Sequence, residues 1–266
     1  LWAARQALRN YLFFFIREPA RSRWKEEHVT AARVVAGGTL LDPNALTIGF
    51  ARRFTGYKRP ELVFHNPDRL FGILNAARRP VQLVFAGKAH PADDTGKHHL
   101  QQVYRRPVDP KFGGRIAFVA DYDLDVAHFL VQGCDVWLNN PRKPLEASGT
   151  SGMKASINGV PNLSIGDGWW AEGYTRQNGW LIEGPQSGDA EAVDAGDAAA
   201  LYDLLERDIV PTFFDRDPQG IPRRWLSYVR QAILSVTPAF SARRMLKEYG
   251  DGMYRPAMRS RVTALK

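Results

Sequence analysis

The sequence predicts a doubly wound α/β fold, in which helices cover both faces of a parallel sheet. Five short apolar runs lie between residues 46 and 165, helix-compatible segments separate them, and polar or glycine-rich turns follow where they end. Strands that are buried on both faces read as continuous apolar runs, because neither face meets water. Ligands of such sheets bind at the carboxyl ends of the strands, and the candidate site residues lie in these turns.

The first expected element is an amphipathic helix over residues 2–18, which should end before Pro19 because proline lacks the backbone N–H that continues a helix. A second helix is expected over residues 60–77, and a third contains Lys154. The five strands are expected at Leu46–Ala51, Val81–Ala86, Arg115–Ala120, Asp135–Leu138 and Pro161–Ile165.

Strand signals fade after residue 185, and helical patterns follow. Helices are expected over residues 198–207, 223–236 and 241–249, and the segment 187–200, rich in alanine, aspartate and glycine, is expected to form a surface loop. We therefore predict a Rossmann-like domain over residues 1–185 and a helical tail over residues 186–266 that packs against it.

Composition places the chain among globular proteins. Its 266 residues, 44% of them hydrophobic, suffice for a buried core. The one cysteine, Cys134, cannot form an internal disulfide, which favours a reducing compartment, and we expect the cytoplasm. The longest aromatic and aliphatic run, Tyr11–Ile16, is far shorter than the roughly 20 apolar residues of a membrane span, so no membrane partner is expected.

A net charge of +8 and a pI near 9.7 would suit a polyanionic partner. The arginines are spread along the chain, however, and no zinc-ligand spacing or RNA-recognition signature accompanies them, so nucleic acid is not expected. The six histidines form no H-x-x-x-H or Cys/His cluster, and no metal site is expected.

The most informative run is Glu146-Ala-Ser-Gly-Thr-Ser-Gly-Met-Lys154. A lysine on a helix is ordinarily a solvated surface residue. Here the small residues 149–152 would open a helix whose N-terminal amides and hydroxyls can hold a phosphate. A lysine amine beside a phosphate holder suits pyridoxal phosphate, although a sugar-nucleotide phosphate would suit the same pattern.

The second informative run is the basic turn Arg52-Arg53-Phe-Thr-Gly-Tyr57-Lys58-Arg59, which follows the first expected strand. A run of charges is most often a solvated face. Its place after a strand nevertheless directs it into the ligand crevice, where guanidinium groups grip phosphate in a bidentate manner.

Together the two runs resemble the signature of the α-glucan phosphorylases, the family of glycogen, starch and maltodextrin phosphorylases. The sequence GTSGMK and the expected helical tail are similar to those of the short bacterial-type enzymes. The resemblance extends from about residue 2 to at least residue 183. It implies the Rossmann-like cofactor domain of a two-domain glycosyltransferase architecture of the GT-B type, followed by a helical tail. It also implies that an N-terminal glucan-binding domain is absent from this chain and that the full-length enzyme is a homo-oligomer.

The resemblance also implies roles for individual residues. Lys154 would carry pyridoxal 5′-phosphate as a Schiff base, with Thr150, Ser151, Gly152, Arg52 and Tyr122 around the cofactor. Arg53 and Lys58 would bind the substrate phosphate, and Tyr57, Glu146, Ala147, Ser148 and Gly149 would contact the transferred glucosyl unit. Thr55-Gly56 departs from the His-Glu pair of the animal enzymes, so no role of that pair is carried over.

The implied activity is transfer of a terminal α-1,4-linked glucosyl unit from an α-glucan to inorganic phosphate, giving glucose 1-phosphate with retention of configuration. In this reading Lys154, Arg53, Lys58 and Glu146 are the catalytic residues. Two alternatives stay open. A nucleotide-sugar glucosyltransferase of the glycogen synthase type would turn over its donor without pyridoxal phosphate, and a noncatalytic glucan- or polyanion-binding module would keep its affinity without Lys154.

Overall fold

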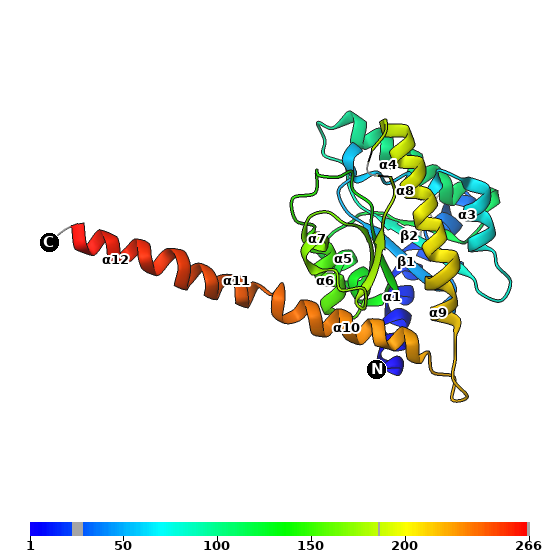
Figure 1. The fold of residues 1–266 in the computed structure, drawn as a ribbon. Coiled ribbons are helices and arrows are strands. Elements are labelled where there is room, and N and C mark those ends of the chain that lie inside the picture. The colour runs from blue at the N-terminus through cyan, green and yellow to red at the C-terminus, as the bar shows by residue number, and fades with distance from the viewer. Residues whose placement is uncertain (23–28, 186, 265–266) are drawn as a thin grey trace.

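The computed structural model describes residues 1–22, 29–185 and 187–264, and its centre is a parallel six-stranded sheet (Figure 1). The strand order is β3-β2-β1-β4-β5-β6. The strands are β1 Leu46–Ala51, β2 Val81–Ala86, β3 Ile116–Val119, β4 Val136–Asn139, β5 Asn162–Ile165 and β6 Gly179–Ile182. The α/β fold class and the five expected strands are therefore confirmed, and β6 was not expected.

The helices of the body are α1 Trp2–Ser22, α2 Ala31–Ala36, α3 Pro67–Leu74, α4 Asp94–Val108, α5 Leu124–Gly133, α6 Thr150–Ile157 and α7 Trp169–Gly173. Those that follow β6 are α8 Ala190–Leu204, α9 Val210–Phe214, α10 Arg223–Ala239, α11 Ala242–Tyr249 and α12 Arg255–Ala264. A π-helical turn at residues 205–209 joins α8 to α9, and a second at residues 250–254 joins α11 to α12.

Two helix predictions are wrong in their bounds. α1 runs through Pro19 to Ser22, because Ile16 and Ala20 are buried and hold its last turns against the core. The helix expected over residues 60–77 is reduced to α3, which begins at Pro67 after the Asn66 side chain accepts a hydrogen bond from the Arg69 N–H.

The loop expected over residues 187–200 is instead mostly helical. α8 begins at Ala190, where the Asp189 side chain accepts a hydrogen bond from the Ala192 N–H. Alanine has the highest helix propensity, so the composition that suggested a loop favours a helix once an N-cap residue precedes it.

Hydrophobic cores cover both faces of the sheet. One contains Ile48 and Phe50 of β1 with residues of α3, α8, α9 and α10, and the other contains Val84 of β2 and Trp137 of β4 with residues of α1, α5 and α6. This is the layer arrangement of a doubly wound fold, and it leaves the carboxyl ends of the strands for ligands.

The helices after β6 differ in how they meet this body. α10 packs against α6, whereas α11 and α12 extend away from the sheet and α11 has no buried residue (Figure 1). No helix within the described ranges combines the length and apolar character of a membrane-spanning segment. The division of the chain at residue 185 stays a prediction, and Gln186 lies outside the described residues.

Cys134 should resist alkylation in the native protein. Its side chain is fully buried, and burial raises the pKa of its thiol, so the nucleophilic thiolate is scarce at neutral pH and above. We expect iodoacetamide at pH 8 to leave native Cys134 unmodified and to modify it fully in denaturant, as measured by mass spectrometry of the intact chain. Rapid modification without denaturant would contradict the burial of this thiol.

Candidate active site

The two informative runs of the sequence meet at the carboxyl ends of β1 and β4. The basic turn Arg52–Arg59 follows β1, and residues 140–149 follow β4. β1 and β4 are parallel neighbours, with Ile48 opposite Val136, so their carboxyl ends open to the same edge of the sheet. Segments about ninety residues apart in the chain thus form one site.

A buried carboxylate joins two cations at this site. Glu146 Oε2 accepts hydrogen bonds from Arg52 Nη2 at 2.7 Å and Lys58 Nζ at 2.6 Å, and Glu146 Oε1 accepts from Lys58 Nζ at 2.8 Å. All three side chains belong to residues less than 10% exposed. Burial lowers the pKa of the Arg52 guanidinium and the Glu146 charge acts in the opposite direction. The cluster carries one net positive charge in a desolvated position.

Arg52 retains hydrogen-bonding capacity that the protein does not use. Its Nε and Nη1 atoms are buried and have no hydrogen-bond partner in the part of the chain that the structure describes. Buried guanidinium nitrogens are nearly always paired, because an unpaired buried donor loses its hydration without compensation. Two unpaired donors on a buried cation suit an anionic oxygen ligand such as phosphate.

Helix α6 follows the Glu146 segment in the chain and carries Lys154. Its N-cap, Gly149, adopts the left-handed conformation with φ 85° and ψ 48°, which turns the chain from the Glu146 segment into the helix. Lys154 is exposed, and among the described residues its amine has no hydrogen-bond or ion-pair partner. Ser148, Thr150 and Lys154 line a cavity of about 510 Å³ together with Phe240 and Met245, and the three cluster residues are not part of its lining.

The remaining expected residues lie in or near the same region. The Lys58 ammonium lies 4.6 Å from the centre of the Tyr57 ring. Burial raises the pKa of the Tyr122 hydroxyl, and the positive charge of Arg52 acts in the opposite direction. Ser151 Oγ accepts a 3.4 Å hydrogen bond from Trp137 Nε1. Gly152 is buried against Asn162 and Trp169, and Ala147 is exposed.

Arg53 is an expected residue that the structure does not bring into the cluster of Glu146, Arg52 and Lys58. Its side chain is exposed, and within residues 1–22, 29–185 and 187–264 it has no ion-pair partner. Trp169 and Trp170, for which stacking on a sugar and buried packing were both considered, are 4% and 1% exposed and pack in the core.

Sequence reasoning missed the role of Arg59, whose only signal was its place in the basic turn. Arg59 adopts a left-handed conformation with φ 46°, and its buried guanidinium donates to the carbonyl oxygens of Asn140 and Pro141, both at 2.9 Å. It also pairs with Asp194 and Asp197 at 2.7 Å. These contacts tie the turn that carries Lys58 to the segment that leads to Glu146.

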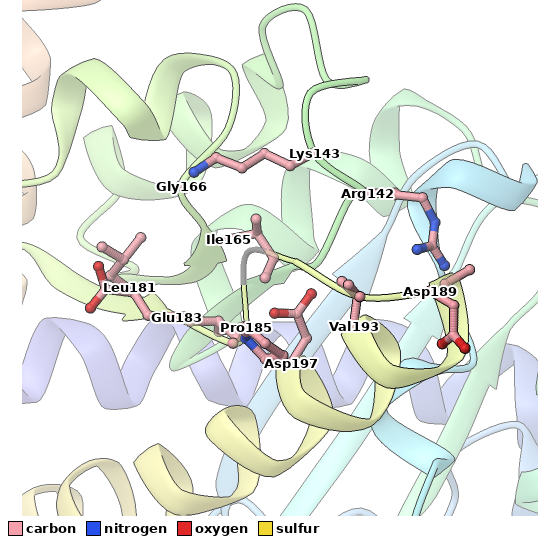
Figure 2. A pocket seen from close by; sticks show the side chains of 14 residues that line it. Arg142, Lys143, Ile165, Gly166, Leu181, Glu183, Pro185, Asp189, Val193 and Asp197 are labelled. Atoms are coloured by element: carbon pink, nitrogen blue, oxygen red, sulfur yellow. The ribbon is translucent and has the colours of Figure 1, made fainter.

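A second cavity, of about 580 Å³, lies where β5 and β6 end and α8 begins (Figure 2). Arg142 and Lys143 line it together with Glu183, Asp189 and Asp197, so its charges are of both signs. Arg142 is already paired with Asp194 at 2.6 Å, and Asp197 with Arg59. No expected site residue lines this cavity, and among the described residues that line it no unpaired buried group favours a ligand.

Comparisons with known proteins show the family of this chain. The family model of the phosphorylases, described as carbohydrate phosphorylase, matches residues 19–173, which include the basic turn, Glu146 and Lys154. A glycogen phosphorylase of Aquifex aeolicus is 50% identical over 257 residues, 96% of this chain and 36% of that protein. A glycogen phosphorylase of Mycobacterium tuberculosis is 47% identical over 98% of this chain and 30% of that protein.

A maltodextrin phosphorylase of Thermococcus litoralis is also 47% identical, over 84% of this chain and 26% of that protein. This chain thus spans about a third of the length of the curated relatives it matches.

A likeness among solved structures concerns the fold alone. A point mutant of TarM from S. aureus, solved with fondaparinux, α-GlcNAc-glycerol and UDP, has a TM-score of 0.52 and 12% identity over 78% of this chain and 35% of that one. It supports the expected Rossmann-like fold. Because the matched residues carry both the Arg52–Lys58 turn and the helix of Lys154, and relatives match along nearly the whole chain, this chain belongs to the carbohydrate phosphorylase family.

Proposed function

We propose that this chain is the cofactor-bearing part of an α-glucan phosphorylase, which transfers a terminal α-1,4-linked glucosyl unit to inorganic phosphate and releases glucose 1-phosphate with retention. The observation that carries the proposal is the buried cluster of Glu146, Arg52 and Lys58, in which Arg52 keeps two unpaired donors among the described residues. The names of the relatives, glycogen phosphorylase and maltodextrin phosphorylase, support the substrate class.

The residues present fit pyridoxal 5′-phosphate. Lys154 offers an accessible amine, the unpaired nitrogens of Arg52 suit the cofactor phosphate, and Thr150, Ser151 and Gly152 form the first turn of α6, whose amides favour an anion. Tyr122 would border the cofactor near Arg52. When bound, the cofactor supplies a second phosphate group able to exchange a proton with the substrate phosphate.

The chain's own side chains would orient the reactants and stabilise charge. Lys58 would bind inorganic phosphate, joined by Arg53 once a ligand draws that exposed side chain inward. Glu146 has two carboxylate oxygens that can accept hydrogen bonds from glucosyl hydroxyls while they hold the cations. Tyr57 and the backbone of residues 147–149 would complete the sugar contacts. Fixed charges of this kind stabilise a developing oxocarbenium-like centre without reorganisation of the protein.

The same proposal names the partners and setting. The substrates are an α-glucan and inorganic phosphate, nucleic acid and membranes are not partners, and the full-length enzyme is a homo-oligomer of the cytoplasm.

Labelling of Lys154 tests the proposed function. We expect that incubation of the protein with pyridoxal phosphate, followed by borohydride reduction and peptide mapping, yields a phosphopyridoxyl group on Lys154. The Lys154→Ala variant should lose this group and its phosphorolysis of maltodextrin, measured as glucose 1-phosphate release. Lys143 is the matched control, because it is also exposed but lines a different cavity from Lys154.

Equal labelling of Lys143 and Lys154 would mean nonspecific modification and would count against the cofactor site. Turnover of a nucleotide sugar by unlabelled protein would favour a glucosyltransferase instead, and glucan binding that survives the Lys154→Ala change without any turnover would favour a binding module.

A further inference from the structure

We propose that Asp167 is a positioning residue, which fixes the backbone of the Glu146 segment and thereby the sugar- and phosphate-binding groups that this segment carries. The inference rests on the proposed function for its effect on activity, and on geometry alone for its effect on the backbone. Nothing in the sequence motifs singles out this aspartate, which follows β5 and precedes the two tryptophans.

The first line of evidence is a pair of hydrogen bonds between two loops. The Glu146 N–H donates to Asp167 Oδ2 at 2.9 Å, and the Trp169 N–H donates to the Ser148 carbonyl oxygen at 2.8 Å. The loop after β5 therefore holds the Glu146 segment at both ends of a three-residue stretch. The Asp167 N–H itself donates to the Ile165 carbonyl oxygen at 2.9 Å, so the aspartate is anchored to the end of its strand.

The second line of evidence is the contact at Gly168. Its backbone has φ 55° and ψ −136°, a conformation that is essentially restricted to glycine. A Cβ atom there would lie 2.6 Å from the Ser148 carbonyl oxygen and 2.9 Å from that of Glu146. The two backbones are therefore in direct contact, and no side chain fits between them.

The third line of evidence is the rigid support behind the loop. Trp169 is 4% exposed and packs edge-on against Phe240 at 5.2 Å, next to the buried Trp170. Its indole also borders Gly149, the N-cap of α6. The loop that carries Asp167 is thus held by the core. The hydrogen bond from the Glu146 N–H to Asp167 therefore fixes the backbone of the Glu146 segment relative to the core.

This position matters because of what the segment carries. The Glu146 side chain must meet Arg52 and Lys58 at once, and the amides after it lead into α6 and Lys154. Asp167 lines a narrow crevice together with Arg52, Glu146 and Ser148. Its carboxylate accepts a hydrogen bond from the Glu146 N–H. It therefore acts through the backbone of Glu146.

The test compares Asp167→Ala with Asp167→Asn in the protein that carries this chain. Alanine removes the acceptor of the Glu146 N–H, and a displacement of about 1 Å in a catalytic group is enough to cost up to about a hundredfold in rate. We expect Asp167→Ala to lower kcat for phosphorolysis by about tenfold or more, with a smaller change in KM for phosphate. Asparagine retains an oxygen acceptor at the same place and should restore most of kcat.

Amide hydrogen exchange of a peptide that contains residues 146–149 gives a readout that does not need activity. We expect exchange at the Glu146 amide to be about tenfold faster in Asp167→Ala and near wild type in Asp167→Asn, because the hydrogen bond that protects this amide is lost only in the alanine variant. Asp189→Ala is the matched control, since Asp189 also accepts a backbone N–H but lies at the start of α8.

Unchanged kcat and unchanged exchange in Asp167→Ala would overturn the inference, as would an Asp167→Asn variant as impaired as the alanine variant. If the wild-type protein has no phosphorolysis while exchange responds as expected, the proposed function fails and the positioning role of Asp167 stands.

Discussion

Replacing Glu146 by glutamine is expected to lower the free energy of unfolding by about 3 to 5 kcal/mol, because removal of one partner leaves a buried charge uncompensated. In this site the change leaves two such charges, Arg52 and Lys58, which both depend on the one carboxylate at 2.6 to 2.8 Å. Glutamine keeps the shape of the side chain, so packing contributes little to the loss. Chemical denaturation of wild type and variant measures the difference.

Inorganic phosphate should return part of the lost stability. In the variant the two cations are free to bind an anion, and a ligand that binds only the folded state stabilises it in proportion to its affinity. We therefore expect phosphate to raise the melting temperature of Glu146→Gln more than that of wild type. Glu172→Gln is the matched control, because Glu172 is exposed on α7. An equal phosphate effect in all three proteins would mean that the cluster is not an anion site.

The sequence predicted five strands well because each is a short, mostly apolar segment that ends in a polar or glycine-rich turn. Leu46–Ala51 and Val81–Ala86 match β1 and β2 residue for residue. β6 was not predicted because it lies beyond the segment in which strands and helices alternate clearly. The first half of α8 was not predicted, because the helix-forming effect of its alanines depends on the Asp189 cap, whereas its second half overlaps the helix expected over residues 198–207.

The position of the two informative runs at strand ends could be predicted, but the pairing of their side chains could not. That the basic turn and the Glu146 run lie at strand ends follows from the strand pattern. That β1 and β4 are neighbours follows from the strand order, which a single sequence does not state. Contacts between distant segments could not be predicted for the same reason. They include the hydrogen bonds from Arg52 and Lys58 to Glu146 and the bond from the Glu146 N–H to Asp167.

A second large effect is expected from Asp135→Ala, at the amino ends of β1 and β4. Asp135 is 1% exposed; its Oδ1 accepts from Arg9 Nη2 at 2.7 Å, and its Oδ2 accepts from the Thr47 N–H at 3.0 Å. Alanine would leave the buried Arg9 charge and a strand amide unpaired, so the free energy of unfolding should fall by about 3 to 5 kcal/mol. Asp251→Ala, which removes an exposed partner of Arg255, is the control and should change stability little.

A double variant separates the charge from the hydrogen bond. In Arg9→Met with Asp135→Asn, the cation is gone and the asparagine oxygen still accepts the Thr47 N–H, so most of the stability should return; neutral replacements of buried ion pairs are often tolerated. If the double variant is as unstable as Asp135→Ala, the loss stems from the packing of α1 on the sheet or from the buried Arg5, whose charge Asp135 also stabilises. Because the Arg9 guanidinium also lies 5.3 Å from the Trp2 and Phe213 rings, methionine, which is long and apolar, is the replacement that best preserves that packing.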